Sequence, residues 1–402
     1  LEVERFAKFF GDAPIIRVSG RTFPVEVIHR PPTRDEEGDL AETIANTVEE
    51  ITAIDPRGDI LVFLPGEREI KDAMDALVQH ALPHTVVLPL YGRLSQAEQA
   101  RVFQPARERR VVLATNVAET SLTIEGIVYV VDTGLARVNR YDPRTGVTRL
   151  LVEPVSRASA DQRKGRAGRT RSGVCFRLWD EAEHATRPEY TDPELLRVGL
   201  AMVVLRMKGL GLGRIEDFAF LDPPSKRAID EGYRVLEELG AIDDAGELTQ
   251  VGRELARLPV DPRIGRMIVA GNAEGALKEV LVVAAALGLQ DPRERPLAAQ
   301  QKADHLHKRF RDETSDFASL VTLFRHYRET IATKPRRAQD RACRDQLLSP
   351  IRMREWADVH RELGSIADDL GYAPKAGEAS AEALHRSILP GFLSRIATYR
   401  PE

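Results

Sequence analysis

The chain of 402 residues has only two cysteines, Cys175 and Cys343, which lie far apart and form no C-x-x-C pair. The sequence therefore supports neither a disulfide framework nor a zinc site, and we expect reduced thiols. The longest apolar run, from Val280 to Leu289, is too short to span a bilayer. The N-terminus lacks the basic-then-apolar pattern of a signal peptide, so we expect a cytoplasmic location and no membrane partner.

The sequence also lacks an excess of charge of either sign. It has 58 Lys and Arg residues and 62 Asp and Glu residues, which gives a formal net charge of -4. A nucleic-acid site, if there is one, must therefore be local rather than spread over the surface. The length predicts more than one domain, each large enough to bury a core.

Two phosphate-binding sequences are missing as well. No G-x-x-x-x-G-K-[ST] run occurs, whose backbone amides and lysine would cradle the β- and γ-phosphates of a nucleotide. No Asp-Glu pair of the D-E-A-H kind is present to hold magnesium and polarise a water. The chain alone is therefore not expected to hydrolyse ATP.

An arginine-rich stretch, R-A-S-A-D-Q-R-K-G-R-A-G-R-T-R at 157–171, is the most informative feature that is present. On a helix, arginines three residues apart would share one face. Guanidinium groups recognise phosphate in bidentate fashion and stabilise the charge that develops during phosphoryl transfer. The alternative is a solvated basic face, but the interspersed glycines lower helix propensity without structural gain, which favours a functional role.

This stretch resembles Q-R-x-G-R-x-G-R, the last motif of superfamily 2 helicases, and A-T-N-V-A-E-T-S-L-T at 114–123 narrows the resemblance to the DEAH-box branch. The order of segments is similar to that of bacterial HrpA-type RNA helicases along the whole chain. The resemblance implies ATP, or another NTP, and Mg²⁺ bound between two RecA-like lobes. Hydrolysis would then drive translocation on single-stranded RNA. The absent motifs would belong to a first lobe, so the chain is interpreted as a C-terminal portion, with that N-terminal lobe as its partner.

Apolar runs alternate with helical stretches between residues 28 and 182, which predicts a parallel α/β sheet with helices on both faces. The resemblance identifies this region as the second RecA-like lobe. Within it, the D-P-R-T-G turn predicts a β-hairpin over 137–153, which is either a plain connection or a wedge beside the nucleic acid. Residues 1–27 are interpreted as a helix (1–10), a strand (15–18) and a crossing linker (20–24) at the end of the first lobe. The predicted strands of the second lobe are Ile60–Leu64, Val86–Leu90, Val111–Ala114, Ile127–Val131 and Val174–Leu178, and its predicted helices include Leu40–Ala53 and Glu67–His80.

After Trp179 the strand pattern stops and further domains are predicted. Helices over 192–207, 226–239 and from 249, with a short hairpin between the last two, fit a winged helix at 183–258. Residues 259–387 are mostly helical and resemble the ratchet-like all-α bundle of the family. Residues 388–402, beginning with an expected strand at Ile388–Tyr399, resemble the start of an oligonucleotide-binding barrel that is cut off at the end of the chain.

The resemblance assigns nucleotide-binding roles to residues of the second lobe. Arg166 and Arg169 are expected to act as arginine fingers at the γ-phosphate, and Gln162 to help place the attacking water. Glu125 is assigned to the nucleotide site, while no residue of the chain is predicted to ligate a metal. Phe103 is either a core residue of the amphipathic segment 94–103 or, as the resemblance implies, stacks on the base.

A second set of residues is assigned to nucleic acid. Thr115 and Asn116 are expected to contact backbone phosphates, although residues of this kind after a strand can also cap a helix. Gly66 and Arg68 follow the first strand of the lobe at the edge where α/β sheets bind ligands, unless they form an ordinary turn. Arg163 is expected to be structural or RNA-facing.

Two basic clusters lie in the helical region and predict either solvated surface or salt-dependent phosphate contacts. They consist of His305, His307, Lys308, Arg309 and Arg311, and of Lys334, Arg336, Arg337, Arg341 and Arg344. Two other functions stay open: a nucleotide-independent module that binds RNA or protein, and a DNA translocase of the same superfamily. Contacts to the 2′-hydroxyl groups would discriminate RNA from DNA.

Overall fold

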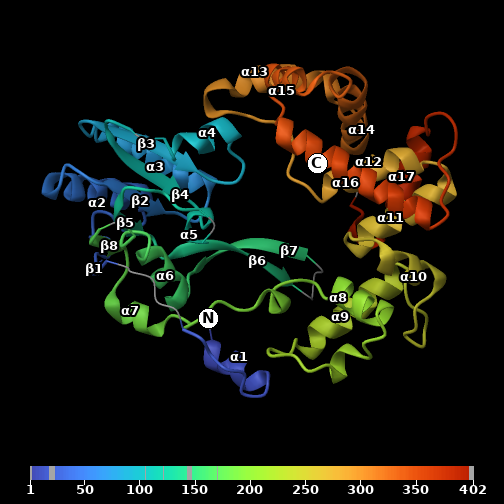
Figure 1. Cartoon of the computed structure of the whole chain (residues 1–402), viewed down its shortest axis with the longest axis horizontal. Coiled ribbons are helices and arrows are strands. Elements are labelled where there is room, and N and C mark those ends of the chain that lie inside the picture. The colour runs from blue at the N-terminus through green and yellow to red at the C-terminus, as the bar shows by residue number, and fades with distance from the viewer. Residues whose placement is uncertain are drawn as a thin grey trace, which may run out of the picture. The chain divides into compact units, whose positions relative to one another are not determined.

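The computed structural model describes residues 2–17, 23–104, 106–120, 122–142, 147–169 and 171–397. The chain folds into two compact units (Figure 1). One unit comprises Leu1–Tyr141 and Thr148–Arg197, and the other comprises Asp142–Val147 and Val198–Glu402.

A six-stranded sheet with the order β1-β8-β5-β2-β4-β3 forms the centre of the first unit, and every neighbouring pair is parallel. The α/β prediction is therefore confirmed, and the five expected strands are present within one or two residues at each end. The strand β1 was not predicted from the sequence; it is an edge strand whose residues alternate between half-buried and exposed and which pairs only with β8. The strands are β1 (Val25–His29), β2 (Asp59–Phe63), β3 (Thr85–Leu90), β4 (Arg109–Ala114), β5 (Ile127–Asp132) and β8 (Gly173–Arg177).

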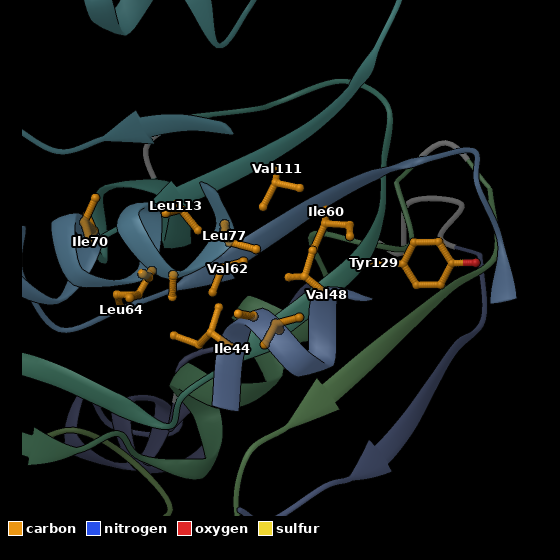
Figure 2. Close-up of a cluster of buried hydrophobic side chains, with 14 of the residues drawn as sticks. Ile44, Val48, Ile60, Val62, Leu64, Ile70, Leu77, Val111, Leu113 and Tyr129 are labelled. Atoms are coloured by element: carbon orange, nitrogen blue, oxygen red, sulfur yellow. The ribbon is translucent and has the colours of Figure 1, made fainter. Parts of the chain in front are cut away.

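Successive residues of β2 point to opposite faces of the sheet and enter two separate cores. Ile60 and Val62 pack against α2 (Leu40–Ile54) and α3 (Glu67–Gln79), both of which were predicted; Figure 2 shows this cluster. Leu61 and Phe63 join a second core. The second core also contains side chains from or beside the short helices α4 (Gln96–Arg101) and α5 (Val117–Thr120) and the turn after α6 (Arg157–Lys164).

The predicted hairpin is present as β6 (Leu135–Asp142) and β7 (Val147–Pro154), which form a two-stranded sheet of their own. Its expected turn at residues 143–146 lies outside the described residues. Because β6 begins three residues after β5 ends, the hairpin starts at the carboxyl edge of the central sheet. Helix α7 (Glu181–Thr186) follows the last strand of that sheet.

The N-terminal segment follows its prediction only in part. The expected helix is α1 (Val3–Phe9), but residues 15–17, expected in a strand, have no regular structure, and Val18 lies outside the described residues. Ile16 is 87% exposed. A strand is stable only when its backbone groups pair with a neighbour, and among the described residues this segment has none. The expected linker residues 20–22 also lie outside the described part.

After the sheet, the helix expected over 192–207 is wrong in its first half. A 3₁₀ turn (Glu194–Leu196) and α8 (Ala201–Gly209) are separate, because Pro193 and Gly199 interrupt the helical pattern. A 3₁₀ turn (Ile215–Asp217), α9 (Lys226–Glu238) and α10 (Gln250–Arg257) follow, and Ile242 and Leu248 form an antiparallel bridge between the last two helices. Helices with one short hairpin agree with the expected winged helix.

The remainder of the second unit is helical, as expected, and contains a buried Trp356 whose indole N–H donates to the Val282 carbonyl at 3.0 Å. The strand expected at Ile388–Tyr399 is wrong over its described part: short 3₁₀ turns occupy Leu389–Gly391 and Leu393–Arg395, because Pro390 and Gly391 favour a turn. The helices are α11 (Pro262–Glu274), α12 (Leu277–Leu287), α13 (Gln300–His307), α14 (Asp316–His326), α15 (Arg336–Asp345), α16 (Pro350–Asp369) and α17 (Ala381–Ile388), with 3₁₀ turns at Leu297–Ala299 and Lys308–Phe310 and a π turn at Tyr327–Ile331.

Candidate functional site

The arginine-rich stretch is helical only in its first half. Helix α6 begins after Ser156, whose hydroxyl accepts from the Ser159 amide, and it ends at Lys164. Arg166 and Arg169 lie in the turns that follow, so the expected single helical face is wrong beyond Lys164. Glycines at 165 and 168 end the helix and separate the arginines into different environments.

Arg163, inside α6, is 1% exposed and is the centre of a buried network. Its Nε donates to Glu119 and its Nη1 to Asp132, both at 2.9 Å, and Nη1 also donates to the Leu135 carbonyl at 3.2 Å. Its guanidinium group lies over the Phe63 ring. Burial opposes the charge, but the two carboxylates outweigh it and raise the pKa of Arg163. The expected contact with nucleic acid is therefore wrong, and Arg163 is structural.

Glu119, on α5, accepts hydrogen bonds from α6 and from the turn after α6. Its carboxylate accepts from the Ser159 hydroxyl at 2.7 Å as well as from the buried arginine. Arg166, which is 8% exposed, donates to the Glu119 carbonyl and, at 2.9 Å, to the Leu122 carbonyl. Burial and the like charge of Arg169 lower the pKa of Arg166. The two guanidinium groups therefore lie close together, one held by backbone carbonyls and the other at the surface.

Arg169 is exposed and donates to the Thr123 hydroxyl. The turn that carries it passes so close to the start of β1 that a Cβ on Gly168 would lie 2.6 Å from the Phe23 carbonyl oxygen. The Phe23 amide donates to the Gly168 carbonyl at 2.9 Å, which fixes the turn. Gln162, on α6, is also exposed. Of the three residues predicted to act at the γ-phosphate, Arg169 and Gln162 are therefore exposed, whereas Arg166 is buried.

Arg110 brings the other predicted nucleotide residues together. It is 8% exposed, its Nε donates to Asp59 at 2.8 Å, and its Nη1 and Nη2 donate to the Val102 and Glu125 carbonyls at 2.8 and 2.6 Å. The two backbone segments therefore meet at the end of the sheet where β4 and β5 begin. Phe103 is 43% exposed whereas Val102 is fully buried. The core interpretation of Phe103 is wrong, and its ring is available for a ligand.

Thr115 and Asn116 lie at the opposite end of the sheet, immediately after β4. Asn116 is exposed, and its carbonyl, like that of Thr115, accepts from an α5 amide. Among the described residues neither side chain accepts from an amide, so the capping alternative is not observed. Both side chains are therefore available to a ligand at this carboxyl edge.

The turn after β2 contributes to the same edge. Gly66 precedes α3, and the side chain of Arg137 lies so close that a Cβ on Gly66 would be 2.7 Å from its Nε. Arg137 in turn donates to Glu69 at 3.1 Å. The Arg68 side chain is 84% exposed and its Nε lies 3.8 Å from Asp72. Arg68 is therefore free to contact a ligand, while Gly66 is buried against Arg137.

Arg187, which the sequence reading missed, holds the root of the hairpin. Its Nη1 donates to the Gly134 carbonyl at 2.7 Å and to the Val155 carbonyl at 3.2 Å, one at each end of the hairpin, and its guanidinium group stacks on Trp179. A cavity of about 350 Å³ adjoins this root and is lined by Asn116 among others. No sequence motif marks Arg187, because R-P-E-Y lies outside every recognised pattern.

The described residues contain neither a membrane-spanning helix nor a metal-binding cluster. Their helices include none that is long and apolar enough to cross a membrane. Their His, Cys, Asp and Glu side chains form no group of three that could hold a metal ion.

Comparison with known families gives three consecutive matches. The helicase conserved C-terminal domain matches residues 42–171. The helicase associated domain HA2 matches as its winged helix at 233–260 and as its ratchet-like part at 261–322. The predicted order of an α/β lobe, a winged helix and a ratchet-like bundle is therefore confirmed.

Curated relatives cover the chain almost end to end. The ATP-dependent RNA helicase HrpA of Escherichia coli (strain K12) is 48% identical over 98% of this chain and 31% of its own length. The HrpA homolog of Haemophilus influenzae is 46% identical over 100% of this chain and 31% of its own length. The pre-mRNA-splicing factor ATP-dependent RNA helicase prp22 of Schizosaccharomyces pombe is 34% identical over 99% and 34%.

A solved structure agrees with these matches. The crystal structure of the E. coli DExH-box NTPase HrpB aligns with a TM-score of 0.75 and 29% identity, over 99% of this chain and 43% of that chain. The chain spans about a third of the length of the curated relatives it matches. Together with the Q-R-K-G-R-A-G-R and A-T-N-V-A-E-T-S-L-T motifs, these matches show that the chain belongs to the DEAH-box helicases of the bacterial HrpA type.

Proposed function

We propose that the chain is the C-terminal part of an ATP-dependent RNA helicase and contributes one side of its nucleotide site together with contacts to single-stranded RNA. One observation carries the proposal. Thr115 and Asn116 lie at the carboxyl edge of the sheet and Glu125 lies at the amino edge, and both Asn116 and Glu125 are exposed. Between them Glu119 ties segment 115–125 to α6 and its arginines. Glu119 thus connects the residues after β4 to α6 and to the turn that follows it.

The nucleotide side consists of Arg169, Arg166, Gln162, Phe103 and Glu125. We assign the arginine finger at the γ-phosphate to Arg169 first, because its guanidinium group is exposed; such a finger contributes about 10³–10⁵ in rate. Arg166 joins it when a phosphate oxygen replaces the Leu122 carbonyl as its acceptor. Phe103 offers an exposed ring for stacking on the base, which discriminates weakly between bases.

The remaining parts of the nucleotide site belong to a partner lobe. A P-loop lysine and an acidic pair for Mg²⁺ are absent from the sequence, and the described residues hold no metal-binding cluster. We therefore assign ATP and Mg²⁺ mainly to an N-terminal RecA-like lobe that carries these groups. Arginine side chains without a P-loop agree with this assignment, because an arginine finger completes a nucleotide site in which another lobe already binds the phosphates.

The RNA side consists of Thr115, Asn116 and Arg68, with Gly66 setting the shape of the neighbouring turn. Hydroxyl, amide and guanidinium groups at one edge of a sheet suit a sugar–phosphate backbone and carry no sequence preference. The hairpin leaves this same edge and is held at its root by Arg187. We assign to it the role of a wedge that separates strands as hydrolysis moves the RNA.

ATP hydrolysis by the chain alone, and by the chain mixed with a separate P-loop lobe, tests the proposal. The chain alone is expected to release no phosphate from ATP. When it is mixed with a separately prepared P-loop lobe of the family, we expect RNA to stimulate phosphate release. Arg169→Ala should abolish that release. Arg171→Ala is a matched control, because its exposed guanidinium group lies against Gly58 rather than toward Thr123. Release by the chain alone, or equal rates for the two variants, would overturn the assignment.

Competition between single strands tests the choice of substrate. RNA and DNA oligonucleotides of equal length and sequence would be titrated against the chain at one salt concentration. RNA is expected to bind more tightly, because only RNA offers 2′-hydroxyl groups to the Thr115 and Asn116 side chains. Equal affinities would favour a DNA translocase. Binding of a protein ligand with no affinity for either strand would favour a nucleotide-independent module.

A further inference from the structure

The cavity at the root of the hairpin is lined mostly by side chains to which the proposed function gives no role. We propose that this cavity, here called the root cavity, binds one nucleobase and gives the chain a preference for the base that it holds. The inference rests on the proposed function in that Asn116 contacts the strand that carries the base. The root cavity has a volume of about 350 Å³ and lies wholly within the first unit. Its walls come from the hairpin, from the start of α6 and from the chain after α7, with Asn116 beside them.

Hydrogen bonds fix the walls of the root cavity in the absence of a ligand. Arg140 of β6 donates to Glu153 of β7 at 2.8 Å and to Asp192 at 2.6 Å, which ties the hairpin to the chain after α7. The Tyr141 amide donates to the Arg197 carbonyl at 2.9 Å and makes a second tie between the same two segments. The cavity is therefore preformed, and its volume lies near the lower end of the range of about 300–1,000 Å³ that is typical of small-ligand sites.

The start of α6 contributes polar groups that already have partners. Ser156 is buried, its hydroxyl accepts from the Ser159 amide at 3.2 Å, and it lies 3.0 Å from the Thr191 hydroxyl. The Ser159 hydroxyl donates to Glu119 at 2.7 Å. The side chains that distinguish one ligand from another must therefore lie on the other walls.

The charges that line the root cavity cancel. Three guanidinium groups and three carboxylates contribute to the lining. Arg137 donates to Glu69 at 3.1 Å and Arg140 is held by two carboxylates, so an entering phosphate would have to displace an ion pair. A neutral ligand is therefore favoured over a phosphate or a carboxylate. The six charged residues are Arg137, Arg140, Arg197, Glu119, Glu153 and Asp192.

The neutral part of the lining suits a flat heterocycle with a polar edge. Leu150, Pro154 and Pro188 offer apolar surface to the faces of a ring. Asn139 of β6 is exposed, and its side chain makes no hydrogen bond with a described residue. A carboxamide presents a donor and an acceptor side by side and pairs with the edge of a base in bidentate fashion. Bases that leave a stack are bound in this way, by hydrogen bonds to their edge and apolar contacts to their faces.

The position of Asn116 indicates where the base comes from. Asn116 is exposed and also lines the root cavity, so it lies at the opening. A strand whose backbone contacts Asn116 carries its bases past that opening, and unstacked bases are the groups through which proteins read single-stranded RNA. The backbone contacts themselves carry no sequence preference. A free nucleoside offers the same heterocycle, and the experiment below separates the two sources.

Base preference in strand binding tests the inference on the chain as it stands. Fluorescein-labelled oligoribonucleotides of A, of C and of U, equal in length, would be titrated with the wild type and with Asn139→Ala at one salt concentration. Asn139→Ala should lower the ratio of the affinities for oligo-A and oligo-U by at least about fivefold, because an asparagine amide pairs in bidentate fashion with N6 and N7 of adenine. The cost of unstacking oligo-A is the same for both proteins and cancels in this comparison.

Two further variants show whether the preference comes from the side chain of Asn139. Asn139→Asp offers only acceptors, so it should shift the preference toward oligo-C, whose N4 donates. Thr148→Ala, at an exposed position of β7 outside the lining, should keep the oligo-A to oligo-U ratio within about twofold. Equal changes of the ratio in Thr148→Ala and Asn139→Ala would overturn the inference, since the hairpin as a whole would then explain both.

Two parallel measurements separate the inference from the proposed function. Asn116→Ala should weaken the binding of all three strands alike. Calorimetric binding of adenosine that Asn139→Ala loses, with an unchanged ratio in strand binding, would assign the root cavity to a free nucleoside. An unchanged ratio without adenosine binding would refute the root cavity and leave the proposed function standing. No RNA binding by the wild type would refute the proposed function, and the adenosine titration would then decide the root cavity by itself.

Discussion

Replacing Arg163 by methionine should destabilise the first unit more than any exposed substitution in the same motif. The change removes a side chain that is 1% exposed and leaves Asp132, which is 0% exposed, without its cation. Breaking one partner of a buried pair costs about 3–5 kcal/mol. Because the Gly134 amide still donates to Asp132 at 2.9 Å and Glu119 is partly solvated, we expect about 3 kcal/mol.

The two tryptophans allow this loss to be measured in one unit at a time. Trp179 belongs to the first unit and Trp356 to the second, so a Trp356→Phe background leaves only Trp179 as a reporter. Urea unfolding followed by Trp179 fluorescence would give the free energy of unfolding of the unit that contains Arg163. The exposed Arg169→Met, in the same background, is the matched control and should cost less than about 0.5 kcal/mol.

A second substitution shows whether the buried charge is the cause. Asp132→Asn removes the unpaired carboxylate but keeps an oxygen for the Gly134 amide, so it should recover at least about 1.5 kcal/mol in the Arg163→Met chain. In the wild-type chain the same substitution should destabilise. A cost of Arg163→Met below about 1 kcal/mol, or strictly additive effects of the two substitutions, would refute the network as described.

Three other predictions concern stability and rigidity. Burial, with two nearby arginines, lowers the pKa of His360 to about 4, so as the pH falls from 6.5 toward 4 the unfolded chain is protonated at this residue before the folded chain is. The free energy of unfolding of the second unit should therefore fall by up to about 3 kcal/mol over this range in the wild type, and His360→Phe should not show this fall. Gly168→Ala should destabilise the first unit by about 1–3 kcal/mol, because the new Cβ meets the Phe23 carbonyl; a neutral effect in urea unfolding would contradict this contact. Arg187→Lys cannot hold both hairpin ends at once, so amide exchange in β6 and β7 should accelerate about tenfold, whereas unchanged exchange would mean that the hairpin root is held by other contacts.

The central strands could be predicted because they are buried on both faces and read as continuous apolar runs. β4 and β5 are buried at every position. Strand β1 was not predicted because an edge strand exposes every second residue, among them Glu26. The strands expected at Ile15 and Ile388 failed for a related reason: an apolar run becomes a strand only where a neighbour pairs with it, and these segments have none among the described residues.

The candidate site could be located from sequence but not resolved. The motif letters at 162–169 do not reveal that Arg163 is buried, Arg166 is held by carbonyls and Arg169 is exposed, because burial depends on how α6 packs against α5. Arg110 and Arg187 were missed for the same reason, since their partners are backbone carbonyls and, for Arg110, also the carboxylate of Asp59, all brought close only by the fold. Such bonds leave no pattern of residue types.

The stimulation of hydrolysis by RNA tests the central claim most directly, because the claim is that segment 115–125 joins two separate sites. The chain mixed with a P-loop lobe would be assayed with and without single-stranded RNA, as wild type, Asn116→Ala and Arg169→Ala. The account predicts that Asn116→Ala keeps the unstimulated rate and loses most of the stimulation, and that Arg169→Ala loses both. Full stimulation in Asn116→Ala, or an unstimulated rate preserved in Arg169→Ala, would contradict it.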